Sequence, residues 1–200
     1  MSWLERIDDW ISASFSWLMK LVLLLVFFSE LFWGDYLVAT GALIALTISL
    51  LPSAIERNYH INLPWAIDFM VTLGLTLHTI GLYYNLYHDP AWWWWDNFTH
   101  FLGTAVIALL AFYIVFTLDY TKKVRLTLPF MVISTIMTAM AIGAFWEIGE
   151  FNFDGLFGTK AIIDLTDTIQ DLEFDFLGSI VVAIIGVLYT RHLRTKHGPR

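Results

Sequence analysis

Acidic side chains recur at helical spacing in the last third of the chain. Four aspartates follow one another at intervals of three, four and four residues: Asp164, Asp167, Asp171 and Asp175. Three further acids lie just upstream at intervals of three and four: Glu147, Glu150 and Asp154. Side chains three or four residues apart share one face of an α-helix. Carboxylates gathered in this way bind a cation or share protons, because several of them cannot all stay ionised at close range.

An earlier stretch adds a histidine to these acids. In WDNFTHFLG, residues 95–103, Asp96 and His100 are four residues apart and share a helix face. The ordinary interpretation takes Asp96 as a helix N-cap and His100 as an interfacial histidine bonded to a neighbour. The functional interpretation takes His100 as a cation ligand or a proton-transfer group.

Carboxylate oxygens with one imidazole suit a divalent cation such as Mg²⁺, Mn²⁺, Ca²⁺ or Zn²⁺. Acids near a helix C-terminus oppose the helix dipole, so Glu147 and Glu150 are placed where a cation would compensate. The predicted metal ligands come from all three stretches: Asp96, His100, Glu147, Glu150, Asp154, Asp164, Asp167, Asp171 and Asp175. If the site is catalytic, three of these are candidates for the chemistry: His100, Glu147 and Asp171.

A short internal similarity links two of these stretches. The pattern of an acid, three residues, a potential ligand and then F-L-G occurs in DNFTHFLG, residues 96–103, and in DLEFDFLG, residues 171–178. We expect the two stretches to begin parallel helices. In each, a glycine (Gly103 or Gly178) follows the ligand by one turn and permits close helix approach.

The elements that position these residues are predicted to be membrane helices. Of the 200 residues, 58% are hydrophobic and only 14% are charged, against about 25% charged in soluble domains. We therefore expect an all-α polytopic membrane protein with residues 1–200 in a single transmembrane domain. The lack of cysteine excludes disulfides and thiolate chemistry. A nucleic-acid partner is not expected, because the chain has only 11 Lys and Arg and no basic stripe.

Apolar runs predict six spans, near residues 15–32, 36–55, 65–87, 98–118, 126–146 and 171–189, after an interfacial lead-in over residues 1–16. With both termini in the cytoplasm, ten basic residues fall inside and only Lys160 falls outside, as the positive-inside rule requires. The acidic stretches then all lie at the outer side. In the third span, Asp68 is interpreted as structural. His78 is interpreted as bonded to a neighbouring carbonyl or as a proton relay.

Length places part of the acidic stretch at membrane depth. A span needs about 20 residues, so the sixth helix must begin near Asp171, which carries Asp175 into the hydrocarbon region. A carboxylate there costs about 2.5–3.5 kcal/mol on insertion scales and usually has a function. We expect residues 155–170 to lie across the mouth of an outward-open pocket, hinged at Gly155 and Gly158.

The chain resembles the YjdF family of bacterial inner-membrane proteins, which has no established activity. The resemblance rests on WDNFTHFLG, AFWEIGEFNFDGLFG and DLTDTIQDLEFDFLG, residues 95–103, 144–158 and 164–178. A looser similarity to VanZ-like membrane proteins rests on an outer histidine, an acid-bearing helix end and a later acidic segment. The resemblance implies a multi-pass protein of the bacterial inner membrane and supplies no reaction.

Three functions stand open. The first is a cation-dependent site that binds or acts on a lipid or phosphorylated headgroup, as a metal-dependent hydrolase or transferase would. The second is a transporter of a divalent cation or a proton-coupled solute, for which the polar path below the acids is thin. The third is a non-catalytic membrane scaffold. Membrane lipids are the expected partners, and homo-oligomerisation is left open.

Overall fold

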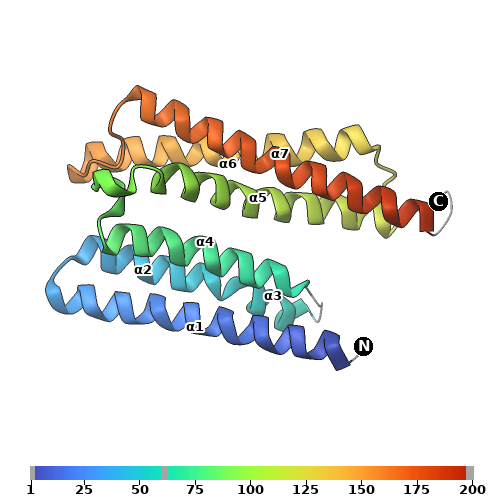
Figure 1. The fold of residues 1–200 in the computed structure, drawn as a ribbon, viewed down its shortest axis with the longest axis horizontal. Coiled ribbons are helices and arrows are strands. Elements are labelled where there is room, and N and C mark those ends of the chain that lie inside the picture. The colour runs from blue at the N-terminus through green and yellow to red at the C-terminus, as the bar shows by residue number, and fades with distance from the viewer. Residues whose placement is uncertain (1–2, 60–62, 197–200) are drawn as a thin grey trace. The chain divides into compact units, whose positions relative to one another are not determined.

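A computed structural model describes the backbone of residues 3–59 and 63–196, and these ranges contain helices joined by short connections and no strand. This confirms the all-α prediction. The helices are labelled in Figure 1, with two short 3-10 turns between α4 and α5. Their bounds are α1 Trp3–Trp33, α2 Tyr36–Ser49, α3 Leu51–Tyr59, α4 Trp65–Tyr83, η1 Leu86–His88, η2 Pro90–Trp92, α5 Trp95–Tyr120, α6 Leu128–Phe157 and α7 Leu165–Lys196.

Six helical segments of the described chain are long and apolar enough to cross a membrane, as predicted. They cover Ser14–Trp33, Tyr36–Asn58, Trp65–Tyr83, Trp95–Tyr120, Leu128–Phe157 and Leu165–Lys196. The second is interrupted between α2 and α3, where Pro52 lacks the N–H that would continue the helical ladder. The amphipathic lead-in proposed for residues 1–16 begins α1. The side chains that define its face (Trp3, Leu4, Ile7, Trp10 and Ile11) lie outside the described ones.

Three predicted helix ends are wrong. The third span stops at Tyr83, because Asn85 takes a left-handed backbone conformation with φ 53° that turns the chain. The fifth continues to Phe157, eleven residues past its predicted end. The sixth begins at Leu165, before Asp171. Hydropathy identifies only the residues that cross the hydrocarbon region of the membrane. The fifth and sixth helices, α6 and α7, continue beyond those residues.

The chain divides into two compact units, residues 1–95 and 96–200, called here the N-terminal and C-terminal units. The single-domain organisation stays a prediction. In the N-terminal unit, Lys20 of α1 is only 3% exposed and its Nζ lies 2.8 Å from Asp68 Oδ1 of α4. Ser16 also donates to Asp68. Asp68 is therefore structural, as predicted, and Lys20 is a buried partner rather than a loop charge that could set topology.

His78 also has a local partner in the N-terminal unit. Its Nδ1 lies 2.7 Å from the Tyr87 hydroxyl. The bond to a neighbouring carbonyl and the proton-relay role stay predictions.

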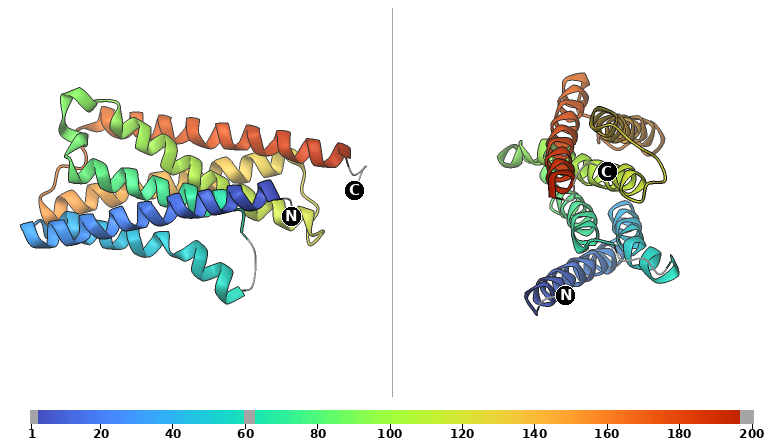
Figure 2. Two further views of the ribbon diagram at one scale, coloured as in Figure 1. Left: turned by 60° about the horizontal axis from the view of Figure 1, so that its bottom comes forward. Right: turned by 90° about the vertical axis from the view of Figure 1, so that its right-hand side faces the viewer.

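The C-terminal unit is a packet of three helices. Figures 1 and 2 show α5, α6 and α7 side by side, with α5 and α7 running in the same direction and α6 in the opposite one. A Cβ at Gly178 would lie 2.3 Å from the Phe101 carbonyl oxygen, so glycine is required where α7 meets α5. A Cβ at Gly103 would meet nothing within 4 Å. The predicted close approach is thus confirmed at Gly178 and wrong at Gly103.

Charge separates toward the two ends of the C-terminal unit. The α5–α6 connection and the last turns of α7 carry basic residues: Lys122, Lys123, Arg125, Arg191 and Arg194. Apart from Asp119, which pairs with Arg194, the acids of the described part of this unit lie toward the other end. On α7, Asp175 and Arg191 are 16 residues apart, about 24 Å at 1.5 Å per residue. This is less than the roughly 30 Å hydrocarbon thickness, so with Arg191 at one interface Asp175 lies inside the apolar region. The direction of insertion stays a prediction.

Candidate functional site

One face of α5 supplies the histidine of the candidate site. Asp96, His100 and Thr104 follow at intervals of four residues and so stack along the helix. Because α5 begins at Trp95, Asp96 lies inside the first turn, and the N-cap interpretation does not hold for it. An acid in a first turn is stabilised by the positive end of the helix dipole.

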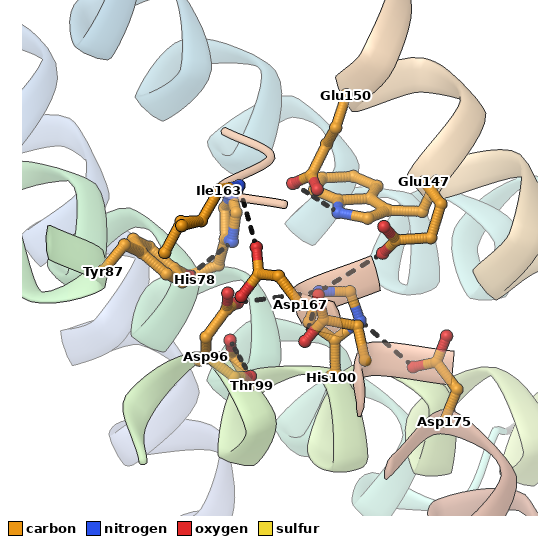
Figure 3. Close-up of polar contacts among 12 residues, drawn as sticks. His78, Tyr87, Asp96, Thr99, His100, Glu147, Glu150, Ile163, Asp167 and Asp175 are labelled. Carbon is orange, nitrogen blue, oxygen red and sulfur yellow. Dashed lines mark hydrogen bonds and ion pairs between the residues drawn. The ribbon is translucent and has the colours of Figure 1, made fainter. Parts of the chain in front are cut away.

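His100 is the centre of the cluster, and carboxylates from all three helices surround it (Figure 3). Its Nε2 lies 3.6 Å from Asp96 Oδ1, 3.7 Å from Glu147 Oε1 and 3.9 Å from Asp171 Oδ1. Its Nδ1 lies 3.3 Å from Asp175 Oδ1. The two ring nitrogens therefore face different partners, three carboxylates on one side and one on the other.

Asp175 of α7 is fixed in place from two neighbouring helices, α5 and α6. Its Oδ1 accepts hydrogen bonds from the Thr104 hydroxyl and contacts His100. Opposite, a Cβ at Gly143 of α6 would lie 2.1 Å from Asp175 Oδ2, so the carboxylate occupies the space that glycine leaves. Asp175 is only 1% exposed. Its position is therefore set by packing as well as by hydrogen bonds.

The buried acids have too few hydrogen-bond donors. Both oxygens of Glu147 accept no hydrogen bond within the described structure, and the same is true of Asp171 Oδ1 and Asp175 Oδ2. These residues are 5%, 3% and 1% exposed. A buried polar atom left without a partner costs about 1–3 kcal/mol, and more if it is charged. His100 supplies at most one positive charge to the group, so the carboxylates need protons or a further cation.

Glu150 lies one turn beyond Glu147 on α6 and is half-buried. Its Oε1 accepts a hydrogen bond of 2.9 Å from the Trp146 indole. The second oxygen of this carboxylate can still serve a ligand.

The donor atoms are spaced as a metal ion would need them. Two groups each offer ligand atoms that all lie within 4.8 Å of one another: Asp96 with His100 and Asp171, and His100 with Glu147 and Glu150. Ligands on opposite sides of an ion lie about 4–5 Å apart, twice the usual metal–ligand distance of 2.0–2.6 Å. Small side-chain movements would bring these groups to coordination distance. Figure 3 shows Asp96 and Glu147 on the same side of the imidazole and Asp175 on the other.

Asp154, a further predicted ligand, holds the α6–α7 connection. It accepts hydrogen bonds from the Thr159 hydroxyl at 2.5 Å and from the backbone N–H groups of Ala161 and Ile162 at 2.9 and 3.0 Å. Gly158 ends α6 with φ 68°, a conformation that favours glycine. Gly155 lies within α6, so the predicted hinge there is wrong.

Asp164 and Asp167 cap the start of α7. Asp164 Oδ1 accepts the N–H groups of Thr166 and Asp167 at 2.6 and 3.1 Å. Asp167 Oδ2 in return accepts the Ile163 N–H at 3.0 Å. The hydrogen bonds from the Asp167 and Thr166 backbone lower the pKa of the exposed Asp164 carboxyl, because they favour its charged form. Of the nine predicted ligands, six gather around His100 or include it, whereas Asp154, Asp164 and Asp167 build the connection.

Sequence reasoning missed Thr104 and Gly143. Thr104 could have been found four residues after His100, on the same helix face as Asp96. Gly143 lies four residues before Glu147 and therefore shares its face. Neither residue type is unusual in a membrane helix, so the spacing was the only signal.

The helices and their apolar length define a multi-pass integral membrane protein with a carboxylate–histidine cluster. The model of the family described as predicted membrane protein DUF2238 matches residues 15–192, and the chain belongs to this family. The YjdF resemblance is confirmed, since that family and this one are the same. The VanZ-like similarity stays a prediction. No curated protein and no solved structure shows significant similarity to the chain.

Proposed function

We propose that the C-terminal unit binds a divalent cation beside His100 and uses it to hold or act on a phosphorylated or polar headgroup. The observation that supports this most is the burial of Glu147 and Asp171 beside Nε2 of His100, with carboxylate oxygens that accept no hydrogen bond from the described residues. Ionised carboxylates are rarely buried unless they are paired or coordinate a metal.

Asp175 orients the histidine in this proposal. A carboxylate cannot donate, so a neutral His100 gives its Nδ1–H to Asp175 and keeps its Nε2 lone pair toward the other acids. Metal-binding histidines usually donate their second N–H to a carboxylate or a carbonyl. Asp175 therefore acts as an orienting partner rather than as the ligand that the sequence predicted. The proposed ligands are Asp96, His100, Glu147, Glu150 and Asp171.

The cation would neutralise the buried acids and could bind a phosphate oxygen or lower the pKa of a water molecule. The chain's own part is to arrange the ligands and to exclude bulk water. His100, Glu147 and Asp171 remain the candidates for a hydrolase or transferase reaction. The proposed location is the outer side of the bacterial inner membrane, where the positive-inside rule directs the acidic end.

The described residues of the C-terminal unit offer few buried polar groups for a transport path. Between the cluster and the basic end, the buried polar residues of the described chain are Thr135, Ser179 and Thr190. The hydroxyls of Ser179 and Thr190 bond carbonyls of their own helix. Thr135 is therefore the one of these three buried hydroxyls that forms no hydrogen bond within its own helix, and a single hydroxyl is too little to replace a hydration shell.

Thermal unfolding with and without divalent cations tests the proposal. After treatment with a chelator, adding the correct cation should stabilise the purified chain by about 2.7 kcal/mol when the cation concentration is 100 times its dissociation constant. Asp171→Asn should abolish this stabilisation, and Glu173→Gln, which changes an exposed acid on the same helix, should keep it. Equal stabilisation of the wild type and Asp171→Asn would reject this site.

A separate experiment tests whether the bound cation holds a phosphorylated headgroup. In the presence of the cation, the wild type should bind glycerol phosphate, and the chelator should abolish the binding. If cation binding is intact but no phosphate ester binds, the metal site stands and the headgroup proposal fails.

A further inference from the structure

A second polar feature lies at the basic end of the C-terminal unit, away from the carboxylate cluster. An open cavity of about 850 Å³ lies between the end of α5, the start of the α5–α6 connection and the last turns of α7. Four basic side chains and a single carboxylate line it: Lys122, Arg125, Arg191, Arg194 and Asp119.

The carboxylate is already paired. Arg194 Nη2 lies 2.8 Å from Asp119 Oδ2 and also donates to the Leu126 carbonyl oxygen at 3.2 Å. Asp119 Oδ1 accepts the Leu126 N–H at 2.9 Å. These bonds hold the connection against α7. Lys122 takes a left-handed conformation with φ 58°, which is uncommon outside glycine and asparagine. The rim of the cavity is therefore an organised turn.

Among the described residues, no acid pairs with the remaining basic groups. Within the described chain, Lys122, Arg125 and Arg191 form no ion pair with a carboxylate. The positive-inside rule requires basic residues near this end, but it does not require them to line a common cavity. Their convergence gives the cavity an excess of positive charge suited to an anion.

The wall of the cavity is apolar and aromatic. Phe116, Leu126 and Leu193 are among its lining residues. The Phe116 ring stacks on Tyr120 at 5.6 Å between centroids and contacts Tyr189 at 5.5 Å. A free inorganic anion would gain nothing from such a wall. A lipid would place its phosphate on the basic rim and its glycerol and upper acyl carbons on these side chains.

We propose that this cavity binds the headgroup of an anionic phospholipid. Basic pockets between membrane helices are known to suit anionic lipid headgroups, and each nearby Lys or Arg contributes about a fivefold gain in affinity. The site is separate from the carboxylate cluster, and the proposal does not depend on the cation.

Native mass spectrometry of the full chain in detergent tests the lipid site, with phosphatidylglycerol as the probe. The wild type should retain phosphatidylglycerol in preference to zwitterionic phosphatidylcholine. Arg125→Gln/Arg191→Gln should bind it on the order of thirtyfold more weakly. Lys123→Gln should bind as the wild type does, because Lys123 lies in the same connection but does not line the cavity. Arg194 is left unchanged because it holds Asp119.

Charge-preserving Arg125→Lys/Arg191→Lys should keep most of the binding, which separates loss of charge from loss of structure. If the double glutamine variant does not fold, the single Arg191→Gln variant should show about a fivefold loss. Undiminished binding in the folded glutamine variants, or equal retention of phosphatidylcholine, would overturn the proposal. So would equally tight binding of soluble glycerol phosphate in the presence of a chelator, which removes binding at the carboxylate cluster, because the apolar wall would then play no part.

Discussion

The two nitrogens of His100 define the chemistry of the carboxylate cluster. Nε2 faces Asp96, Glu147 and Asp171, whereas Nδ1 contacts Asp175, whose place is set by Thr104 and Gly143. An imidazole that donates its Nδ1–H to Asp175 keeps the Nε2 lone pair free for a metal ion. Carboxylates that accept the second N–H of a metal-binding histidine orient the ring in this way. The same acids without a metal would have to share protons with His100.

Asp175→Asn tests the orienting role at the residue scale. The amide keeps the shape of the side chain but loses its charge, so the imidazole becomes a poorer donor to a metal. We expect the dissociation constant of the cation to rise about 10- to 100-fold, measured by competition with a chelating dye. Thr104→Val, which removes the hydroxyl donor to Asp175, should change it in the same direction and by less. An unchanged affinity in both variants would show that Asp175 does not position His100.

At the scale of helices, apolar runs predicted the six membrane spans, but capping chemistry determines where the helices end. Asp154 binds the connection after α6, and Asp164 caps α7. Acids spaced three or four residues apart give the same sequence pattern whether they cap a helix or face the carboxylate cluster. The sequence therefore predicted Asp96, His100, Glu147 and Asp171 as one group, and it could not separate them from the capping acids.

The contact between α5 and α7 gives a prediction at this scale. Gly178→Ala places a methyl group against the Phe101 carbonyl oxygen, and backbone cannot move aside as a side chain can. We expect a loss of about 1–3 kcal/mol in the free energy of unfolding, measured in mild detergent. The matched change Gly103→Ala meets no atom within 4 Å and should cost nothing or stabilise its helix slightly. Equal effects of the two variants would contradict the packing described here.

At the scale of the whole molecule, charge asymmetry predicts the direction of insertion. The buried Lys20–Asp68 pair removes one basic residue from the count, because a paired charge inside a span cannot act as a loop charge. The basic residues of the α5–α6 connection and of the α7 end still oppose Lys160 in the α6–α7 connection. The carboxylate cluster is therefore expected to face outward.

Single-cysteine labelling tests this direction, because the chain has no cysteine of its own. In intact cells, a membrane-impermeant maleimide should label Lys160→Cys and should not label Lys123→Cys. After the membrane is permeabilised, both should react. Labelling of Lys123→Cys alone in intact cells would reverse the topology and place the acidic end in the cytoplasm.

The metal content of the detergent-purified chain, measured by elemental mass spectrometry, tests the central claim most directly. We predict one or two divalent ions per chain in the wild type and in Glu173→Gln, and their loss in Asp171→Asn/Asp175→Asn. Absence of metal from the wild type, even after it is incubated with Mg²⁺, Mn²⁺, Ca²⁺ and Zn²⁺, would contradict the claim. The buried acids would then be held by protons shared with His100.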